Sequence, residues 1–186
     1  ENVMTGRKTL IWTNFVRNIA TLERLFARYE PAKIHGGVPF DAPGADELSR
    51  TRELRRFRED SDCMLMIANP AAAGEGVSLH QVCHDAVYLD RTFNAGQYLQ
   101  SLDRIHRLGL PPSTDTRITL LLSRGTIDEV IDDRVREKAE RLGTMLDDPD
   151  IAAMALPDED EYGAPVDDGD DVRALFAHLL GSDEAG

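Results

Sequence analysis

The stretch Cys63-Met64-Leu65-Met66-Ile67-Ala68 decides the fold that we expect for this chain. It contains no charged side chain, which is typical of a strand that is buried on both faces. Strands of this kind belong to parallel sheets, in which helices cover both faces. The flanking sequence should therefore alternate short apolar strands with helices.

Short apolar runs recur on both sides of this strand. We expect further strands at Lys8 to Trp12, Ala32 to His35, Asp85 to Leu89 and Ile118 to Leu122. Such runs, when helices separate them, form parallel β-α-β units. We therefore predict an α/β fold with a doubly wound, mainly parallel sheet.

Amphipathic segments lie between the expected strands. We expect helices at Val16 to Tyr29, Asp46 to Glu59, Ala95 to Leu108 and Thr126 to Leu142. The last of these begins with a capping box, since Thr126 is followed three residues later by Glu129.

Apolar residues at helical spacing indicate the inward faces of two of these helices. In the second helix we expect Leu48 and Leu54 to face inward. Asn14 should cap the first helix. The apolar stripe of the first helix consists of Ile19, Leu22, Leu25 and Phe26.

The composition changes at Gly143, which we expect to end the last helix. The residues that follow are acidic and contain proline and glycine, as in a solvated linker, before a short apolar run near the end of the chain. We predict one domain over residues 1–143, an acidic linker over residues 144–170 and a short terminal helix over residues 171–181. That helix would dock on the domain or on a partner.

The net charge of −13 is unevenly distributed. Residues 147–186 contain 13 acidic residues and one basic residue, whereas the charges of residues 1–146 sum to −1. The net charge therefore does not exclude a nucleic-acid partner. The arginines between Arg50 and Arg58 are compatible with a solvated helix face and with a phosphate-binding track.

The sequence also predicts the compartment. No apolar run approaches the roughly 20 residues that a membrane span needs, and the first residues lack the pattern of a signal peptide. Cys63 and Cys83 have no CxxC partner, so we expect two buried free thiols rather than a disulfide or a metal site. We therefore expect a cytoplasmic protein with no membrane partner.

The segment from Gln100 to Gly109 places two arginines three residues apart, at Arg104 and Arg107. On a helix these arginines share a face with Gln100, and a planar guanidinium suits the binding of phosphate. On spacing alone, a solvated helix face is as good an explanation as a phosphate site.

The loops after the expected strands carry the remaining informative residues. In parallel sheets, ligands bind beyond the carboxyl ends of the strands. The loops that we expect there are Thr13 to Phe15, His35 to Gly37, Asn69 to Leu79 and Asp90 to Asn94. The histidines have no metal-ligand spacing, so we expect no metal site.

Five motifs, in order and spacing, resemble the second RecA-like lobe of Swi/Snf-type ATPases, a superfamily 2 group of double-stranded DNA translocases. The resemblance covers roughly residues 7–141. The motifs are KTLIWTNF from Lys8, KIHGG from Lys33, AGEGVSL from Ala73, YLDRTFNAGQYLQSLDRIHRLG from Tyr88 and GTIDEVI from Gly125.

Two comparisons refine this resemblance. DEAD-box RNA helicases carry further arginines where this chain has Leu110 and Ser113, so the RNA-helicase pattern fails. Leu110 and the segment Phe93-Asn94-Ala95 depart from the usual Swi/Snf-type sequence, which suggests a divergent, prokaryotic branch. Ala68-Asn69-Pro70 stands where the family usually carries a Ser/Thr pair that approaches DNA phosphate. The departure at Asn69 argues against DNA contact by that residue.

The resemblance implies roles for the nucleotide-binding residues. Arg104 and Arg107 would be arginine fingers that stabilise the γ-phosphate of ATP, and Gln100 would orient them or contact the nucleotide. Gly74 and Gly76 would let the backbone approach the nucleotide closely. Asp90 would be a positioning residue of the same nucleotide-binding group. Glu75 would bind the ribose or couple DNA to the nucleotide, unless it is a plain loop carboxylate.

The resemblance also implies a DNA-binding surface. Thr13, Asn14, His35 and Gly36 occupy the positions at which the family's lobe contacts the DNA backbone. For each of them, a simple turn or cap residue is the alternative.

No GxxxxGK[ST] phosphate loop occurs in the chain, and no Asp-Glu pair follows a buried strand. ATP and Mg²⁺ would thus be held mainly by a separate N-terminal RecA-like lobe. We predict the second motor lobe of an ATP-dependent double-stranded DNA translocase or helicase, inactive in ATP hydrolysis on its own. The alternative is a non-catalytic interaction module that has kept the fold, with the acidic tail docking a partner.

Overall fold

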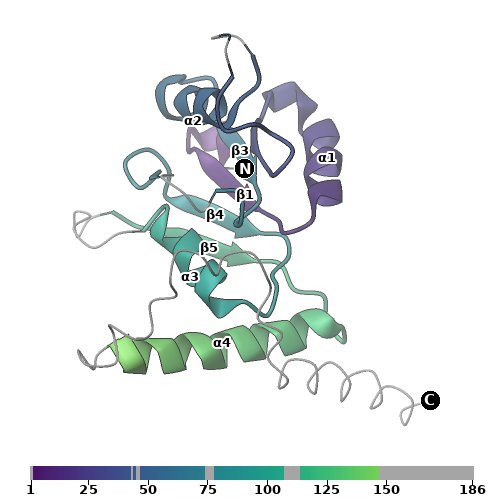
Figure 1. Ribbon diagram of the computed structural model, residues 1–186, viewed down its shortest axis with the longest axis vertical. Coiled ribbons are helices and arrows are strands. Elements are labelled where there is room, and N and C mark those ends of the chain that lie inside the picture. The colour runs from purple at the N-terminus through teal and green to yellow at the C-terminus, as the bar shows by residue number, and fades with distance from the viewer. Residues whose placement is uncertain (1, 43, 45–46, 74–77, 107–113, 147–186) are drawn as a thin grey trace. The chain divides into compact units, whose positions relative to one another are not determined.

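The computed structural model describes residues 2–42, 44, 47–73, 78–106 and 114–146. Its centre is a five-stranded sheet in the order β2-β3-β1-β4-β5, in which every neighbouring pair is parallel (Figure 1). The predicted α/β fold with a mainly parallel sheet is confirmed. The strands are β1 (Thr9–Trp12), β2 (Ala32–Ile34), β3 (Leu65–Ala68), β4 (Asp85–Tyr88) and β5 (Arg117–Leu120).

Four α-helices occur in the described part of the chain. α1 and α2 flank the strands on opposite sides in Figure 1. The helices are α1 (Val16–Leu25), α2 (Arg50–Glu59), α3 (Ala95–Asp103) and α4 (Ile127–Leu146), with short 3-10 turns at Val3–Thr5 and Ala27–Tyr29.

The core lies on the two central strands of the sheet. Every residue of β1 and β3 is buried, as the unbroken apolar sequence of the opening stretch predicts. The rings of Trp12 and Tyr88, on neighbouring strands, lie 6.4 Å apart between centroids and are almost fully buried. Burial on both faces requires helices on both sides, so the sequence of β3 correctly predicts the layering.

α1 differs from the expected helix in its cap and its apolar stripe. The residue that caps its N-terminus is Phe15, without a side-chain bond, whereas the amide of Asn14 donates to Asp90. Of the expected stripe, Ile19 is buried but Leu25 is 70% exposed. The α-helix ends at Leu25, and a 3-10 turn follows at Ala27–Tyr29. Because a 3-10 turn has three residues per turn, the residues after Leu25 do not continue the apolar stripe of α1.

The inward face of α2 was predicted incorrectly. Leu48 lies before the helix and is 39% exposed, and Leu54 is only partly buried. The helix starts after Ser49, whose Oγ accepts a hydrogen bond from the Arg52 amide at 3.2 Å. This start places Glu53 and Phe57 on the buried face instead.

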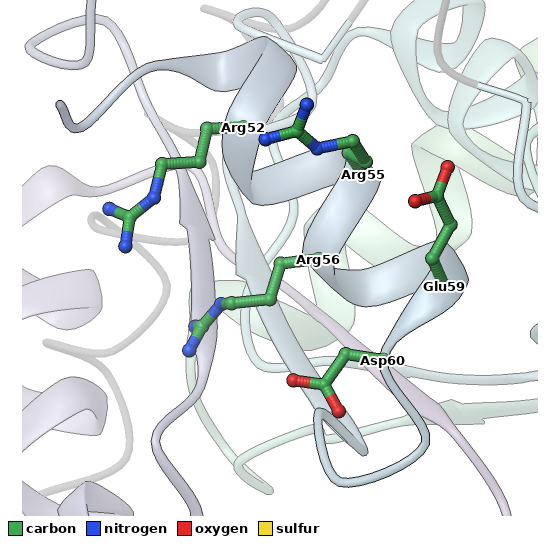
Figure 2. Close-up of a pocket in the computed structure, with 5 residues that line it drawn as sticks. All are labelled: Arg52, Arg55, Arg56, Glu59 and Asp60. Carbon is green, nitrogen blue, oxygen red and sulfur yellow. The ribbon is translucent and has the colours of Figure 1, made fainter. Parts of the chain in front are cut away.

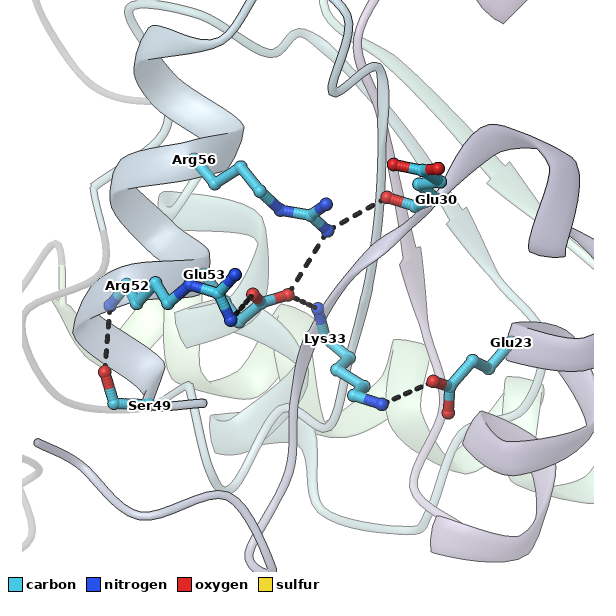
Figure 3. Close-up of polar contacts among 7 residues, drawn as sticks. All are labelled: Glu23, Glu30, Lys33, Ser49, Arg52, Glu53 and Arg56. Carbon is cyan, nitrogen blue, oxygen red and sulfur yellow. Dashed lines mark hydrogen bonds and ion pairs between the residues drawn. The ribbon is translucent and has the colours of Figure 1, made fainter. Parts of the chain in front are cut away.

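Glu53 is buried because its carboxylate has partners. It accepts hydrogen bonds from the backbone amide of Lys33 at 3.0 Å and from Nη2 of Arg56 at 3.4 Å (Figure 3). The Lys33 side chain in turn forms an ion pair with Glu23 on α1. The free-energy cost of burying a carboxylate is much smaller when hydrogen bonds and an opposite charge compensate for the lost water than when the carboxylate is isolated.

The ends of α3 and α4 also differ from expectation. α3 ends at Asp103 rather than at Leu108, and α4 continues through Gly143 to Leu146. A glycine inside a helix costs only about 1 kcal/mol, so it does not by itself stop a long helix. The predicted linker over residues 144–170 therefore begins inside α4, and its remainder and the terminal helix over residues 171–181 lie outside the described residues.

The start of α4 is capped as the sequence predicts. Oγ1 of Thr126 accepts a hydrogen bond from the Asp128 amide at 3.2 Å. The Glu129 carboxylate accepts one from the Gly125 amide, also at 3.2 Å, one residue earlier than in the usual capping box.

The contacts divide the chain into two compact units, Glu1–Asp90 with Leu99–Leu121 and Arg91–Tyr98 with Leu122–Gly186. The first contains the sheet, α1 and α2. In the second, the carboxylate of Asp132 on α4 forms an ion pair with Arg91. In the part of the chain that the structure describes, no helix combines the length and the apolar character that crossing a membrane requires.

Candidate functional site

The candidate site lies at the carboxyl ends of the neighbouring strands β2, β3, β1 and β4, and the predicted site residues follow three of them. Thr13 and Asn14 follow β1, His35 and Gly36 follow β2, and Asp90 lies two residues after β4. Backbone hydrogen bonds join these ends: Thr13 donates to Ala68 at 3.0 Å and Leu89 donates to Trp12 at 2.9 Å. The structure thus brings the predicted DNA-facing residues and Asp90 to one edge of one sheet.

Asp90 holds the loop between β1 and α1. Its Oδ1 accepts hydrogen bonds from the Asn14 amide at 2.7 Å and from Nδ2 of Asn14 at 3.2 Å. Its Oδ2 accepts from Oγ1 of Thr13 and, at 3.0 Å, from Nδ2 of Asn18. Both carboxylate oxygens are therefore engaged inside the protein, which fixes the conformation of the loop.

Thr13 is completely buried, whereas Asn14 is half-buried. Asn18 was not singled out from the sequence, although its spacing of four residues from Asn14 would place the two amides near each other at the start of a helix.

Asn69 lies directly after β3. From the sequence we argued only against DNA contact by this residue, and we did not predict its bonds to neighbouring loops. Its Nδ2 donates to the carbonyl of Asn14 at 2.8 Å, and its Oδ1 accepts from the amide of Ala71 at 2.9 Å. Its own amide donates to the carbonyl of Ile34 at the end of β2, at 2.8 Å. An asparagine whose Oδ1 accepts from the amide two residues later is a common turn former, and the sequence can indicate such a turn. The sequence does not show which group the Nδ2 of this asparagine contacts.

His35 is a neutral hydrogen-bonding residue at the end of β2. Partial burial, reinforced by the positive charge of Lys33, lowers the pKa of His35. Its Nδ1 accepts a hydrogen bond from the Gly37 amide at 3.1 Å, which leaves Nε2 as the protonated nitrogen. Gly36 and Gly37 are exposed, and a Cβ atom on Gly37 would lie 3.1 Å from Cε1 of His35.

Arg50 joins two loops at the same edge. Its Nε donates to the carbonyl of Val38 at 2.9 Å and its Nη1 donates to that of Ala72 at 3.2 Å. Arg50 thus ties the loop after β2 to the loop after β3. The sequence could not distinguish this arginine from its neighbours on α2.

The other arginines of α2 do not form a single phosphate track. Arg56 donates to the carbonyl of Glu30 at 2.9 Å, and Arg58 donates to that of Ser78 at the same distance. Arg52, Arg55 and Arg56 line a surface pocket of about 370 Å³ together with Glu59 and Asp60, and the side chains of Arg52 and Arg56 extend to the same side of the helix (Figure 2). The arginine face of α2 is therefore partly structural and partly solvated.

Gln100 and Arg104 lie next to the buried side of α3. Ser101 lies on that side, with its Oγ 2.6 Å from the hydroxyl of Tyr88, and the fully buried Ile105 follows two residues after the end of the helix. Arg104 comes directly after the helix, and its carbonyl accepts a hydrogen bond from the Leu79 amide at 2.8 Å. Leu79 is thereby hydrogen-bonded to the residue predicted to act as an arginine finger.

Four predicted site residues, Gly74, Glu75, Gly76 and Arg107, lie outside the described residues. Their expected roles stay predictions.

Both thiols are buried, as expected. Burial raises the pKa of Cys83 to about 12 and also raises the pKa of Cys63, so both are protonated at neutral pH. No cluster of three or more metal-ligating side chains occurs within the described ranges.

Comparison with known proteins gives a consistent assignment. The model of the helicase conserved C-terminal domain matches residues 2–109. The chromatin-remodeling ATPase INO80 of Homo sapiens is 28% identical over 136 residues, which is 73% of this chain and 8% of that protein. The transcription regulatory protein SNF2 of Saccharomyces cerevisiae is 29% identical over 146 residues, which is 76% of this chain and 8% of that protein.

A solved structure shares the fold. The crystal structure of the C-terminal part of the Fun30 ATPase domain superposes with a TM-score of 0.59 at 25% identity, over 72% of this chain and 40% of that chain. The chain spans less than a tenth of the length of the two curated relatives above. These relatives are eukaryotic, and the assignment to a prokaryotic branch stays a prediction.

The family match covers more than half of the chain, and within it lie the strands β1 to β4 and the edge on which Thr13, Asn14 and Asp90 meet. The chain therefore belongs to the helicase conserved C-terminal domain family, with relatives among the Swi/Snf-type ATPases.

Proposed function

We propose that this chain is the second motor lobe of an ATP-dependent double-stranded DNA translocase or helicase. One observation carries the proposal: in a helicase C-terminal lobe, the Asp90-held loop of Thr13 and Asn14 lies at the sheet edge, and Gln100 near the end of α3 is followed by Arg104 directly after that helix. The first group faces DNA and the second faces a nucleotide.

In this proposal the nucleotide belongs to a partner lobe. ATP and Mg²⁺ are held mainly by an N-terminal RecA-like lobe, because this sequence contains no phosphate loop. Arg104 and Arg107 act as arginine fingers, and Gln100 orients them. Their guanidinium groups neutralise charge that builds up on the transferred phosphoryl group, which is the usual contribution of such arginines.

At the DNA side, neutral hydrogen-bond donors position the duplex. The Nε2 proton of His35 is suited to a phosphate oxygen, which accepts hydrogen bonds from neutral as well as charged groups. Gly36 allows the DNA backbone to approach the loop closely.

ATP turnover by the isolated chain tests the proposal. The isolated chain should hydrolyse no ATP, with or without duplex DNA, whereas the protein that joins it to its ATP-binding lobe should show turnover that rises with duplex DNA. Steady turnover by the isolated chain that Arg107→Ala abolishes would contradict the proposal. Absence of turnover in the joined protein would favour the interaction-module alternative.

A further inference from the structure

Asn69 joins two loops with one short side chain. Its Nδ2 donates to the carbonyl of Asn14 at 2.8 Å, while its Oδ1 accepts from the amides of Ala71 at 2.9 Å and Ala72 at 3.3 Å. Pro70 follows it, so the backbone torsion of the next residue is fixed and the turn is rigid. The Nδ2 donor of Asn69, which binds the loop after β1, is therefore held in place by the turn after β3.

The residue that Asn69 holds is restrained from two directions. The carbonyl of Asn14 is held by Asn69, and its amide is held by Asp90 at 2.7 Å. Asn69 follows β3 and Asp90 follows β4, so strands on both sides of β1 supply these two bonds. With both of its backbone polar groups bound, Asn14 cannot reorient unless one of these bonds breaks.

We propose that Asn69 is a positioning residue, which fixes the Thr13-Asn14 loop in the orientation that duplex DNA requires and does not itself contact DNA. The inference rests on the proposed function for the identity of the ligand. The brace itself rests only on the hydrogen bonds of Asn69, so the two can be tested separately.

Asn69→Asp separates the two halves of this contact. The carboxylate still accepts from the Ala71 and Ala72 amides, so the turn after β3 is kept. It cannot donate to the carbonyl of Asn14 and places an oxygen against that carbonyl instead. Gln81→Glu is the matched control, since it introduces the same charge on an exposed side chain of the same connection between β3 and β4.

The first measurement is hydrogen–deuterium exchange of the chain without DNA. Asn69→Asp should raise amide exchange severalfold in residues 13–18 and leave residues 71–73 unchanged, while Gln81→Glu should change neither segment. Unchanged exchange in residues 13–18 would overturn the positioning role.

The second measurement is DNA-stimulated ATP hydrolysis by the protein that joins this chain to its ATP-binding lobe. Asn69→Asp should raise the duplex concentration for half-maximal stimulation about tenfold, because a misplaced contact weakens binding, and Gln81→Glu should not change it. A wild-type value together with raised exchange would overturn the link to DNA. If the wild-type protein shows no stimulation, the proposed function fails, and raised exchange in residues 13–18 would still support the brace.

Discussion

Asp90 is the single residue on which the candidate site depends most. Its carboxylate accepts hydrogen bonds from Thr13, Asn14 and Asn18, which together form the end of β1 and the start of α1. The resemblance implies that Asp90 lies among nucleotide-binding residues. Because both of its oxygens bind this loop, its geometry supports positioning rather than direct contact with a ligand.

We expect Asp90→Asn to destabilise the protein by about 2–3 kcal/mol, because an amide cannot replace two accepting oxygens and the hydrogen bonds lose their charged acceptor. The measurement is urea unfolding followed by the fluorescence of Trp12, the only tryptophan, which is buried beside this loop. Asp62→Asn, at an exposed carboxylate, is the control and should leave the unfolding midpoint unchanged. A loss of stability no larger than that of the control would show that Asp90 does not hold the loop.

The sequence predicts part of this network. Thr13, Asn14 and Asp90 are recognisable because each follows an apolar strand, and parallel strands end at the same edge. The contacts among them are not visible in the sequence, since Asp90 lies 76 positions from Asn14 and Asn69 lies 55 positions from it. For that reason the sequence did not reveal the contacts of Asn18 and Asn69.

Among the elements, α2 shows how a single side chain can anchor a helix. Nζ of Lys8, just before β1, donates to the carbonyls of Phe57, Asp60 and Cys63 at and beyond the end of α2. The ammonium group also lies 5.2 Å from the centre of the Phe57 ring. A cation at a helix C-terminus satisfies carbonyls that have no partner within the helix.

Lys8→Met should therefore destabilise the protein by about 2–4 kcal/mol, because the aliphatic stem is kept while three carbonyls lose a charged donor. Thermal or urea unfolding would measure the effect. Arg17→Met removes a positive charge from an exposed position on α1 and should have little effect. Equal stabilities of the two variants would show that the carbonyls at the end of α2 do not need Lys8.

The sequence predicted which segments are strands and helices better than it predicted the residues at which they begin and end. The five strands and their parallel arrangement follow from short apolar runs between amphipathic segments. The predicted inward face of α2 was wrong: the helix starts after Ser49, Leu48 lies before it, and its buried residues are Glu53 and Phe57. A buried glutamate could not be expected from sequence, since its partner is the backbone amide of Lys33 on another element.

On the scale of the whole molecule, neighbouring residues belong to different compact units. Asp90 is bound within the unit that contains the sheet, and Arg91 is bound to Asp132 within the unit that contains α4. The sequence predicts one domain over residues 1–143 and gives no sign of two units. The division into two compact units depends on contacts between residues far apart in the sequence, which no local pattern shows. The family assignment applies to residues 2–109, which lie mostly in the first unit.

The central claim is that arginines of this lobe act on ATP held by another lobe. The most direct test is single-turnover ATP hydrolysis by the joined protein carrying Arg104→Ala and Arg107→Ala. Arg55→Ala, at an exposed arginine of α2, is the control. Our account predicts a loss of about 10³-fold or more in the rate constant with ATP binding largely kept, since arginine fingers stabilise the transition state. A rate within about threefold of the Arg55→Ala control would contradict it, because so small a change corresponds to less than one kcal/mol of transition-state stabilisation.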